Sequence, residues 1–187
     1  MDIIQYSTVL AAGSLLLAAA TFLSVVGFFF SPRLREKLNR ITYTTWMTLI
    51  GGLSAASVIG TLIYQFTYLT PVCSLCWWQR IFMFPLTLIA AIALYTRSRT
   101  DHLITGSMAA LGLLFASYHY YGHFQKYVIG NPFLLPCSTS ALEPSCSESP
   151  IILFGFMTIP LFGVIAFSAI IWLSYLAHRK SQTIETV

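Results

Sequence analysis

Between Ile41 and Thr96 the sequence carries one charged side chain, Arg80, and otherwise consists of apolar and neutral polar residues. Over the whole chain of 187 residues, 57% are hydrophobic and 9% are charged. Soluble domains contain roughly a quarter charged residues, so this composition excludes an ordinary soluble fold. We therefore expect an all-α integral membrane protein.

Five uncharged apolar runs are long enough to span a hydrocarbon core, which takes about 20 helical residues. They cover approximately residues 9–30, 46–69, 77–96, 103–121 and 151–174. The first run could be a cleaved signal peptide, but the preceding segment contains Asp2 and no basic residue, and the run is long for a signal core. An uncleaved helix is the expected structure.

The placement of the basic residues predicts the orientation of these spans. Eight of the ten Lys and Arg lie in three short segments, which are 33–40, 97–99 and 179–180. Positive residues favour the cytoplasmic side, and in a chain of five spans these segments share one side. We expect an N-out and C-in protein of the cell inner (cytoplasmic) membrane. The net charge of +4 then reflects topology and does not indicate a nucleic-acid partner.

The four cysteines all fall on the predicted outer side, where disulfides persist. Four cysteines allow three pairings, and spacing favours Cys73 with Cys76 and Cys137 with Cys146. The first pair stands at the expected start of a helix, where backbone amides stabilise a thiolate, so we expect Cys76 to have the lower pKa. The second pair lies in a segment rich in proline, for which we expect a mobile loop and an exposed, exchangeable disulfide.

Several residues near the dithiol are candidates for ligand binding. Arg80 follows Cys76 by four residues and would lie on the same helix face, and a cation within a membrane span usually has a function. Phe84 extends this stripe as an aromatic wall or as ordinary packing. Gln65 could contact a ligand or make a buried hydrogen bond. His119 could bind a ligand carbonyl or relay a proton, or be a satisfied interfacial histidine, whereas we expect His123 to face solvent.

At these residues the sequence resembles the bacterial disulfide bond formation protein B family, including its shorter Gram-positive-type members. The matching stretches are CSLCWWQRIFMFP at 73–85, YHY at 118–120 followed by QK at 125–126, PC at 136–137 through Cys146, and FGF at 154–156 followed by IP at 159–160. The resemblance covers roughly residues 45–177. A dithiol motif alone would be weak support, but the arginine, the later cysteine pair and the topology together are specific.

The resemblance implies a four-helix transmembrane bundle at 41–177 with an outer redox loop at 122–150. Residues 1–40 would then be an additional N-terminal transmembrane helix with a basic cytoplasmic loop, and residues 178–187 a cytoplasmic tail that we expect to be disordered. The family core has four spans, so the additional helix is a departure from its pattern. It reverses the side of the N-terminus without moving the cysteines.

The resemblance also implies an activity. Such a protein is a thiol:quinone oxidoreductase that reoxidises an extracytoplasmic thioredoxin-fold thiol oxidase similar to DsbA, and so supports disulfide formation in exported proteins. By position, Cys137 resembles the cysteine that forms the mixed disulfide with the partner, and Cys146 resembles its mate. Cys73 resembles the cysteine that exchanges with the loop pair.

The remaining site residues are assigned to the quinone, which would be ubiquinone or menaquinone. Cys76 resembles the cysteine that interacts with the quinone, and Arg80 the arginine on the quinone side. His119 is by position a further quinone contact. No metal is expected.

Three other interpretations remain open. A vitamin K epoxide reductase-like enzyme also couples loop cysteines to a membrane dithiol and a quinone, but its loop pair precedes the dithiol in sequence. A non-enzymatic membrane protein could carry structural disulfides, although this would leave Arg80 without a role. A metal site would require the cysteines to join His119 or His123, and the gap of eight residues between Cys137 and Cys146 fits a metal site poorly.

Overall fold

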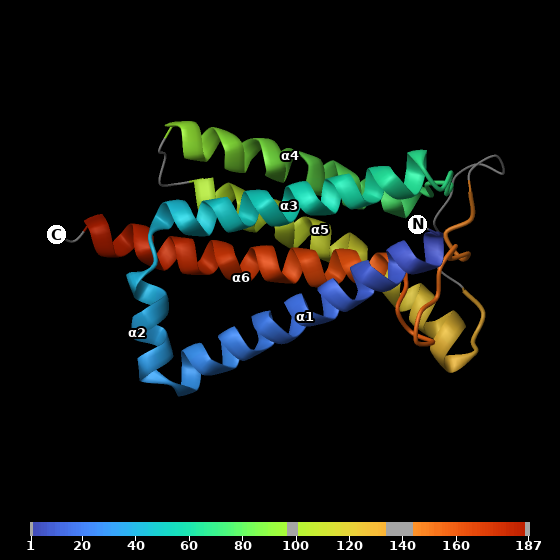
Figure 1. Cartoon of the computed structure of the whole chain (residues 1–187), viewed down its shortest axis with the longest axis horizontal. Coiled ribbons are helices and arrows are strands. Elements are labelled where there is room, and N and C mark those ends of the chain that lie inside the picture. The colour runs from blue at the N-terminus through green and yellow to red at the C-terminus, as the bar shows by residue number, and fades with distance from the viewer. Residues whose placement is uncertain (1, 97–100, 134–143, 186–187) are drawn as a thin grey trace.

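The chain is all-helical over the residues that its computed structural model describes, which are 2–96, 101–133 and 144–185. The expected fold class is therefore confirmed. Figure 1 shows the helices in order: α1 (Ile3–Phe30), α2 (Pro32–Arg40), α3 (Tyr43–Phe66), α4 (Ser74–Thr96), α5 (Asp101–Phe124), the π-helix η1 (Gln125–Ile129) and α6 (Ile159–Glu185).

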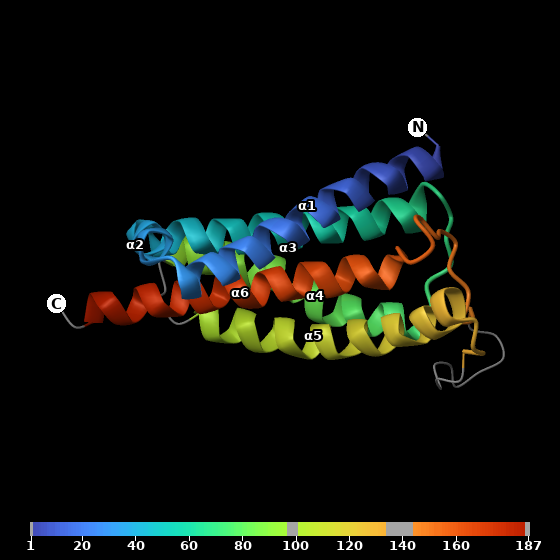
Figure 2. The same cartoon turned by 90° about the horizontal axis from the view of Figure 1, so that it is seen from below.

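Four long helices, α3 to α6, form the bundle. Each contacts two neighbours, since α3 packs on α4 and α6, and α5 packs on α4 and α6. Their shared core is built from buried apolar side chains that include Met47, Ile50, Leu86, Phe167 and Ile170. Helix α1 lies obliquely across the outside of this bundle, and α2 connects it back to α3 (Figures 1 and 2).

Four helices, α1, α3, α4 and α6, are long and apolar enough to cross a membrane. The expected additional N-terminal apolar helix is among them. The predicted span at 103–121 lies in α5, a helix of 24 residues. Helix α5 is too polar to be counted among these four, because it contains residues such as His102, Thr105, His119 and His123, which are buried. That α5 also crosses the membrane stays a prediction, which its place alongside α4 and α6 supports.

Capping residues explain why a helix forms between α1 and α3, where the sequence suggested a loop. Ser31 accepts a hydrogen bond from the backbone N of Leu34 at 3.4 Å, and Pro32 occupies the first helical position, where its missing N–H costs nothing. Thr42 caps α3 in the same way through Thr45. The basic segment expected as a loop is therefore the short helix α2.

The last helix begins eight residues later than predicted. Phe154 and Gly155 have φ of 54° and 78°, and they turn the chain so that Leu153 and Met157 pair as an isolated antiparallel bridge. The apolar run at 151–158 is thus a turn, and α6 starts only at Ile159. At its other end α6 continues to Glu185, so the expectation of a disordered tail from residue 178 is wrong.

The two ends of the bundle differ in chemistry. The N-terminus, the α3–α4 connection and the segment 144–158 lie at one end, whereas α2 and the C-terminus lie at the other (Figure 1). Cys73, Cys76 and Cys146 thus share an end that is opposite to the basic residues of α2. This relative arrangement agrees with the predicted topology, while the absolute orientation in a membrane stays a prediction.

Candidate functional site

The dithiol stands at the beginning of α4. Cys73 directly precedes the helix, and its carbonyl accepts the hydrogen bond from the backbone N of Trp77 at 3.1 Å. Cys76 lies in the first turn. Both cysteines are free thiols, and their sulfurs are 3.0 Å apart, within hydrogen-bonding distance. A disulfide needs sulfurs about 2.05 Å apart, so a small side-chain rotation would let this pair close.

The second cysteine pair reaches the dithiol through Cys146. The Cys146 and Cys73 sulfurs and a ring nitrogen of His119 all lie within 4.8 Å of one another. Cys146 is disulfide-bonded, and Cys137, its expected partner, lies outside the described residues. Cys146 is fully buried, with an exposed fraction of 0%, so the expectation of an exposed disulfide is wrong at this sulfur.

His119 is buried between the two cysteine pairs. Its Nδ1 lies 3.1 Å from Gln79 Nε2, and the same amide nitrogen donates to the carbonyl of Leu75 at 3.3 Å. A carbonyl only accepts, which identifies this atom as the amide nitrogen and makes Nδ1 the acceptor. The proton of the neutral imidazole is therefore on Nε2, which donates to the Cys146 carbonyl at 3.3 Å and lies 4.0 Å from Cys73 Sγ.

His123 was expected to face solvent, and this expectation is wrong, since its exposed fraction is 1%. Its Nε2 donates to the same Cys146 carbonyl at 2.8 Å, and its ring packs against that of His119 with centroids 4.7 Å apart. The two histidines are four residues apart on α5 and so share one face of the helix. That spacing was the sequence signal that could have placed His123 in the site.

The residues after Cys146 are fixed to η1. Lys126 Nζ donates to the Ser147 carbonyl at 3.0 Å and pairs with Glu148 at 2.6 Å. The Tyr127 hydroxyl also donates to the Ser147 carbonyl, and it accepts from the backbone N of Ser149. These contacts and the two histidines hold the backbone of Cys146 close to the start of α4. The Cys146 sulfur then lies within 4.8 Å of the Cys73 sulfur.

The surroundings lower the pKa of Cys73 to about 4. The largest cause is the hydrogen bond shared with the Cys76 sulfur, and His119 adds to it. The two sulfurs share a proton across 3.0 Å, so a single thiolate charge belongs to the pair. The expectation that Cys76 has the lower pKa stays a prediction. A thiolate is the attacking or leaving species in disulfide exchange, so this pair is prepared for that chemistry.

Arg80 lies one helical turn beyond Cys76 and is buried, with an exposed fraction of 8%. Its guanidinium donates to Gln65 Oε1 and to the Thr61 carbonyl, the latter at 3.2 Å, and lies 5.4 Å from the ring centre of Trp77. Gln65 thus makes the buried hydrogen bond that the sequence allowed. These acceptors are neutral, so the charge of Arg80 remains available to an electron-rich group.

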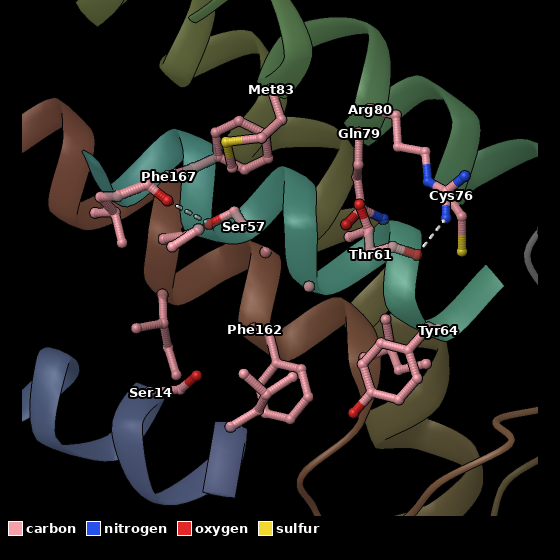
Figure 3. Close-up of a pocket in the computed structure, with 18 of the residues that line it drawn as sticks. Ser14, Ser57, Thr61, Tyr64, Cys76, Gln79, Arg80, Met83, Phe162 and Phe167 are labelled. Carbon is pink, nitrogen blue, oxygen red and sulfur yellow. Dashed lines mark hydrogen bonds between the residues drawn. The ribbon is translucent and has the colours of Figure 1, made fainter. Parts of the chain in front are cut away.

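A cavity of about 570 Å³ lies beside Cys76 and Arg80, between α1, α3, α4 and α6. Its polar lining includes Thr61, Cys76, Gln79 and Arg80, and most of the other residues are apolar, Phe84 among them. Figure 3 shows Arg80, Cys76 and Thr61 together at one end of the cavity. His119 is not a lining residue and contacts the cavity only through Gln79.

These features suit a quinone. The volume falls in the range of about 300–1,000 Å³ for small-molecule sites. The walls match an apolar molecule, and a buried cation lies beside a dithiol sulfur at the polar end. A metal ion fits less well at Cys73, His119 and Cys146, since a metal binds cysteine as a thiolate, whereas Cys146 is already disulfide-bonded.

Comparison with known proteins identifies relatives of most of this chain. Residues 43–177 match the family model of disulfide bond formation protein DsbB. A probable disulfide formation protein of Coxiella burnetii is 32% identical over 128 residues, which is 68% of this chain and 80% of that protein. Disulfide bond formation protein C of Bacillus subtilis is 32% identical over 147 residues, or 77% and 99% of the two chains. No solved structure is a significant match.

Proposed function

Because the chain belongs to the disulfide bond formation protein DsbB family, and is thus a membrane disulfide oxidoreductase, we propose that it passes electrons from a soluble thiol oxidase to a membrane quinone. The donor would be an extracytoplasmic thioredoxin-fold protein similar to DsbA. The acceptor would be ubiquinone or menaquinone. The observation that carries the proposal is the 4.8 Å approach of Cys73, His119 and Cys146, which joins the two cysteine pairs.

The first half of the proposed cycle takes electrons from the partner. A thiolate of the partner attacks Cys137, and Cys146 leaves as a thiolate. Cys146 then attacks Cys73 of the Cys73–Cys76 disulfide, and Cys76 leaves with the electron pair. The second thiol of the partner attacks its own mixed disulfide and releases Cys137. Cys137 then attacks Cys146 of the Cys146–Cys73 disulfide, so that Cys73 leaves as a thiolate and the loop disulfide is restored. The partner leaves oxidised, and Cys73 and Cys76 carry its two electrons and two protons.

The second half returns the dithiol to its disulfide. A quinone, when bound, accepts two electrons and two protons and leaves as a quinol. Cys76 lines the cavity and delivers the electrons as the Cys73–Cys76 bond forms. Arg80 stabilises the negative charge that develops on the quinone oxygen. In the proposed cycle, a free dithiol beside a disulfide-bonded Cys146 would belong between the two halves.

The low pKa of Cys73 supports the direction of electron flow. A stabilised thiolate favours the reduced form of a cysteine pair and makes its disulfide the stronger oxidant. The pair on α4 would therefore draw electrons from the loop pair. His119 supports this by holding the Cys146 carbonyl while its N–H lies beside Cys73. We thus assign His119 first to the sulfur exchange, with an indirect link to the quinone through Gln79.

We also propose which side of the membrane each end of the bundle faces. The end of the bundle with the cysteines would face the periplasm or the outside of the cell, and the end with α2 would face the cytoplasm. There the partner meets Cys137, and the quinone reaches the cavity from the bilayer. This placement rests on the distribution of basic residues.

The test is quinone reduction by the purified full-length protein, with a reduced thioredoxin-fold partner as the donor and ultraviolet absorbance as the readout. Wild-type protein should turn over many equivalents of quinone, and Cys76→Ser should reduce none. If wild-type protein reduces neither ubiquinone nor menaquinone with its cysteines intact, the proposal fails and the structural-disulfide interpretation gains support. The vitamin K epoxide reductase-like interpretation is already disfavoured by the family match.

A further inference from the structure

Helix α1 lies outside the part of the chain that matches the family, which begins at residue 43, yet it forms one wall of the cavity. Its contributing residues recur with helical spacing and therefore share one face. They are Val9, Leu10, Gly13, Ser14 and Leu17. The additional helix is thus part of the candidate quinone site.

Polar contacts hold α1 in this position on both sides of the cavity. Toward the cysteine end, Tyr6 donates to the Gly60 carbonyl at 3.3 Å, and Tyr64 donates to Ser7 Oγ at 2.9 Å. Toward the other end, Trp172 Nε1 on α6 donates to Ser24 Oγ at 3.0 Å. Helix α1 therefore runs from α3 at the cysteine end to α6 toward the other end, along one side of the cavity (Figure 2).

The wall made by α1 faces the apolar part of the cavity. In Figure 3, Ser14 lies near Phe162, at the opposite end from Arg80 and Cys76. Gly13 leaves open space there, since a Cβ at this position would meet nothing within 4 Å. The polar side chains near the dithiol, which are Thr61, Cys76, Gln79 and Arg80, come from α3 and α4. A ligand with a polar ring and a long apolar chain would place its ring at Arg80 and its chain along α1.

We propose that α1 binds the isoprenoid tail of the quinone, so that the ring is recognised by the family core and the tail by the additional helix. This inference rests on the proposed function and adds a specificity element to it. Because the quinone would enter from the bilayer, its tail exchanges lipid contacts for contacts with α1, and the fit of the tail to this wall changes binding without touching the reacting atoms.

The test compares Gly13→Phe with Ala12→Phe in the full-length protein. Gly13 lines the cavity, whereas Ala12 is an exposed neighbour on the same helix that does not line it. Equilibrium binding in nanodiscs is measured by quenching of tryptophan fluorescence, with the quinone expressed per lipid. The two ligands are a quinone with a long isoprenoid tail and its tailless ring analogue.

Gly13→Phe should weaken binding of the tailed quinone by about fivefold or more, because the new ring would occupy space beside the tail and overpack this wall of the cavity. Its affinity for the tailless analogue should stay close to that of wild-type protein, and Ala12→Phe should change neither. Equal effects of the two variants on the tailed quinone would overturn the role of α1. So would an equal loss of affinity for both ligands in Gly13→Phe.

A second measurement needs no variant. A quinone with a photoactivatable group at the end of its tail should label residues 9–17 of wild-type protein, and the unmodified tailed quinone should compete with the labelling. Labelling confined to α3 and α4 would overturn the inference. These results can be told apart from a failure of the proposed function. The proposed function fails if wild-type protein reduces neither quinone. The role of α1 fails if wild-type protein reduces quinone but residues 9–17 are not labelled and Gly13→Phe does not distinguish the tailed quinone from its tailless analogue.

Discussion

The two sulfurs of the dithiol are 3.0 Å apart and lie against very different surroundings. Cys73 lies beside His119 on α5 and the segment that carries Cys146. Cys76 lines a mostly apolar cavity with Arg80 at the same end. We call these the exchange side and the cavity side. In the proposed cycle, this contrast would let two adjacent sulfurs serve a water-soluble donor and a lipid-soluble acceptor without moving apart.

The bundle geometry produces this contrast. Helix α4 packs between α3 and α5, so its first turn has one neighbour on each side. Helix α5 brings the histidines, and α3 closes the cavity together with α1 and α6. Because the sulfurs are held by a helix start and not by a loop, the division between the two sides is rigid.

Replacing each sulfur should abolish turnover for a different reason. In Cys76→Ser the remaining Cys73 thiolate can still attack Cys146, so a Cys73–Cys146 disulfide should accumulate and be trapped by alkylation. In Cys73→Ser this disulfide cannot form. Peptide mapping without reductant detects the link. The division between the sides would be wrong if Cys73 of the Cys76→Ser variant were linked to a cysteine other than Cys146.

Replacing Arg80 should affect only the cavity side. Hydrogen bonds to charged groups contribute about 1.5–3 kcal/mol, so Arg80→Ala should raise the apparent KM for quinone by about 10- to 100-fold. The rate of internal exchange between the cysteine pairs, followed by rapid alkylation, should stay unchanged. Arg80→Lys keeps the charge and serves as the matched variant. Wild-type kinetics of Arg80→Ala over a full quinone titration would refute the assigned role.

Replacing His119 should affect the exchange side. His119→Phe removes one cause of the lowered Cys73 pKa, so this pKa should rise above its value of about 4. Thiolate absorbance at 240 nm, titrated in the reduced protein, measures the shift. His123→Phe is the control, because it removes a donor to the Cys146 carbonyl without removing a cause of that pKa. The role of His119 would be contradicted if the pKa of Cys73 kept its wild-type value in both variants.

The same shift predicts a pH dependence of stability. Since the pKa of Cys73 is lowered from 9.0 to about 4 on folding, its contribution should be full above about pH 9 and lost as the pH falls to about 4. Reduced wild-type protein should therefore gain thermal stability over this range relative to His119→Phe. The melting temperatures of both proteins across the range check the sign.

The smallest effect is expected from a second histidine pair, at the other end of the bundle. His102 on α5 and His178 on α6 are hydrogen-bonded at 2.8 Å, far along the helices from the cysteines. His178→Gln should cost about 1 kcal/mol of stability, a typical hydrogen bond, and leave both the quinone KM and the exchange rate unchanged. A change in the quinone KM or in the exchange rate would show that the end of the bundle opposite to the cysteines takes part in the chemistry.

Much of the fold follows from local sequence properties. Uncharged runs predict helices because a membrane span must satisfy its own backbone hydrogen bonds, and the runs at 46–69 and 77–96 match α3 and α4 closely. The late start of α6 was missed because Phe154 and Gly155 adopt positive φ within an apolar run, and hydropathy does not sense backbone angles. Helix α2 was missed because its basic residues were interpreted only as an indication of membrane orientation.

The sequence indicated the cysteines and Arg80 as candidate site residues, but it could not predict the contacts between side chains of different helices. The i, i+4 spacing of Cys76 and Arg80 is local, and the structure retains it. The bonds from His119 and His123 to the Cys146 carbonyl join positions more than 20 residues apart, which periodicity cannot pair. The position of α1 beside the cavity was equally unpredictable, because its apolar face would suit contact with lipid just as well.

The burial of the two exchanging sulfurs has a consequence for how selectively electrons enter the protein. Cys73 is 5% exposed and Cys146 is 0% exposed, so a small thiol diffusing in solution has almost no surface of either sulfur to attack. Each sulfur instead meets the other as part of the same chain, at a local concentration that a free thiol does not match. The buried contact thus protects the two exchanging sulfurs from reduction by free thiols. In the proposed cycle, reducing equivalents would enter instead through Cys137, from a partner protein.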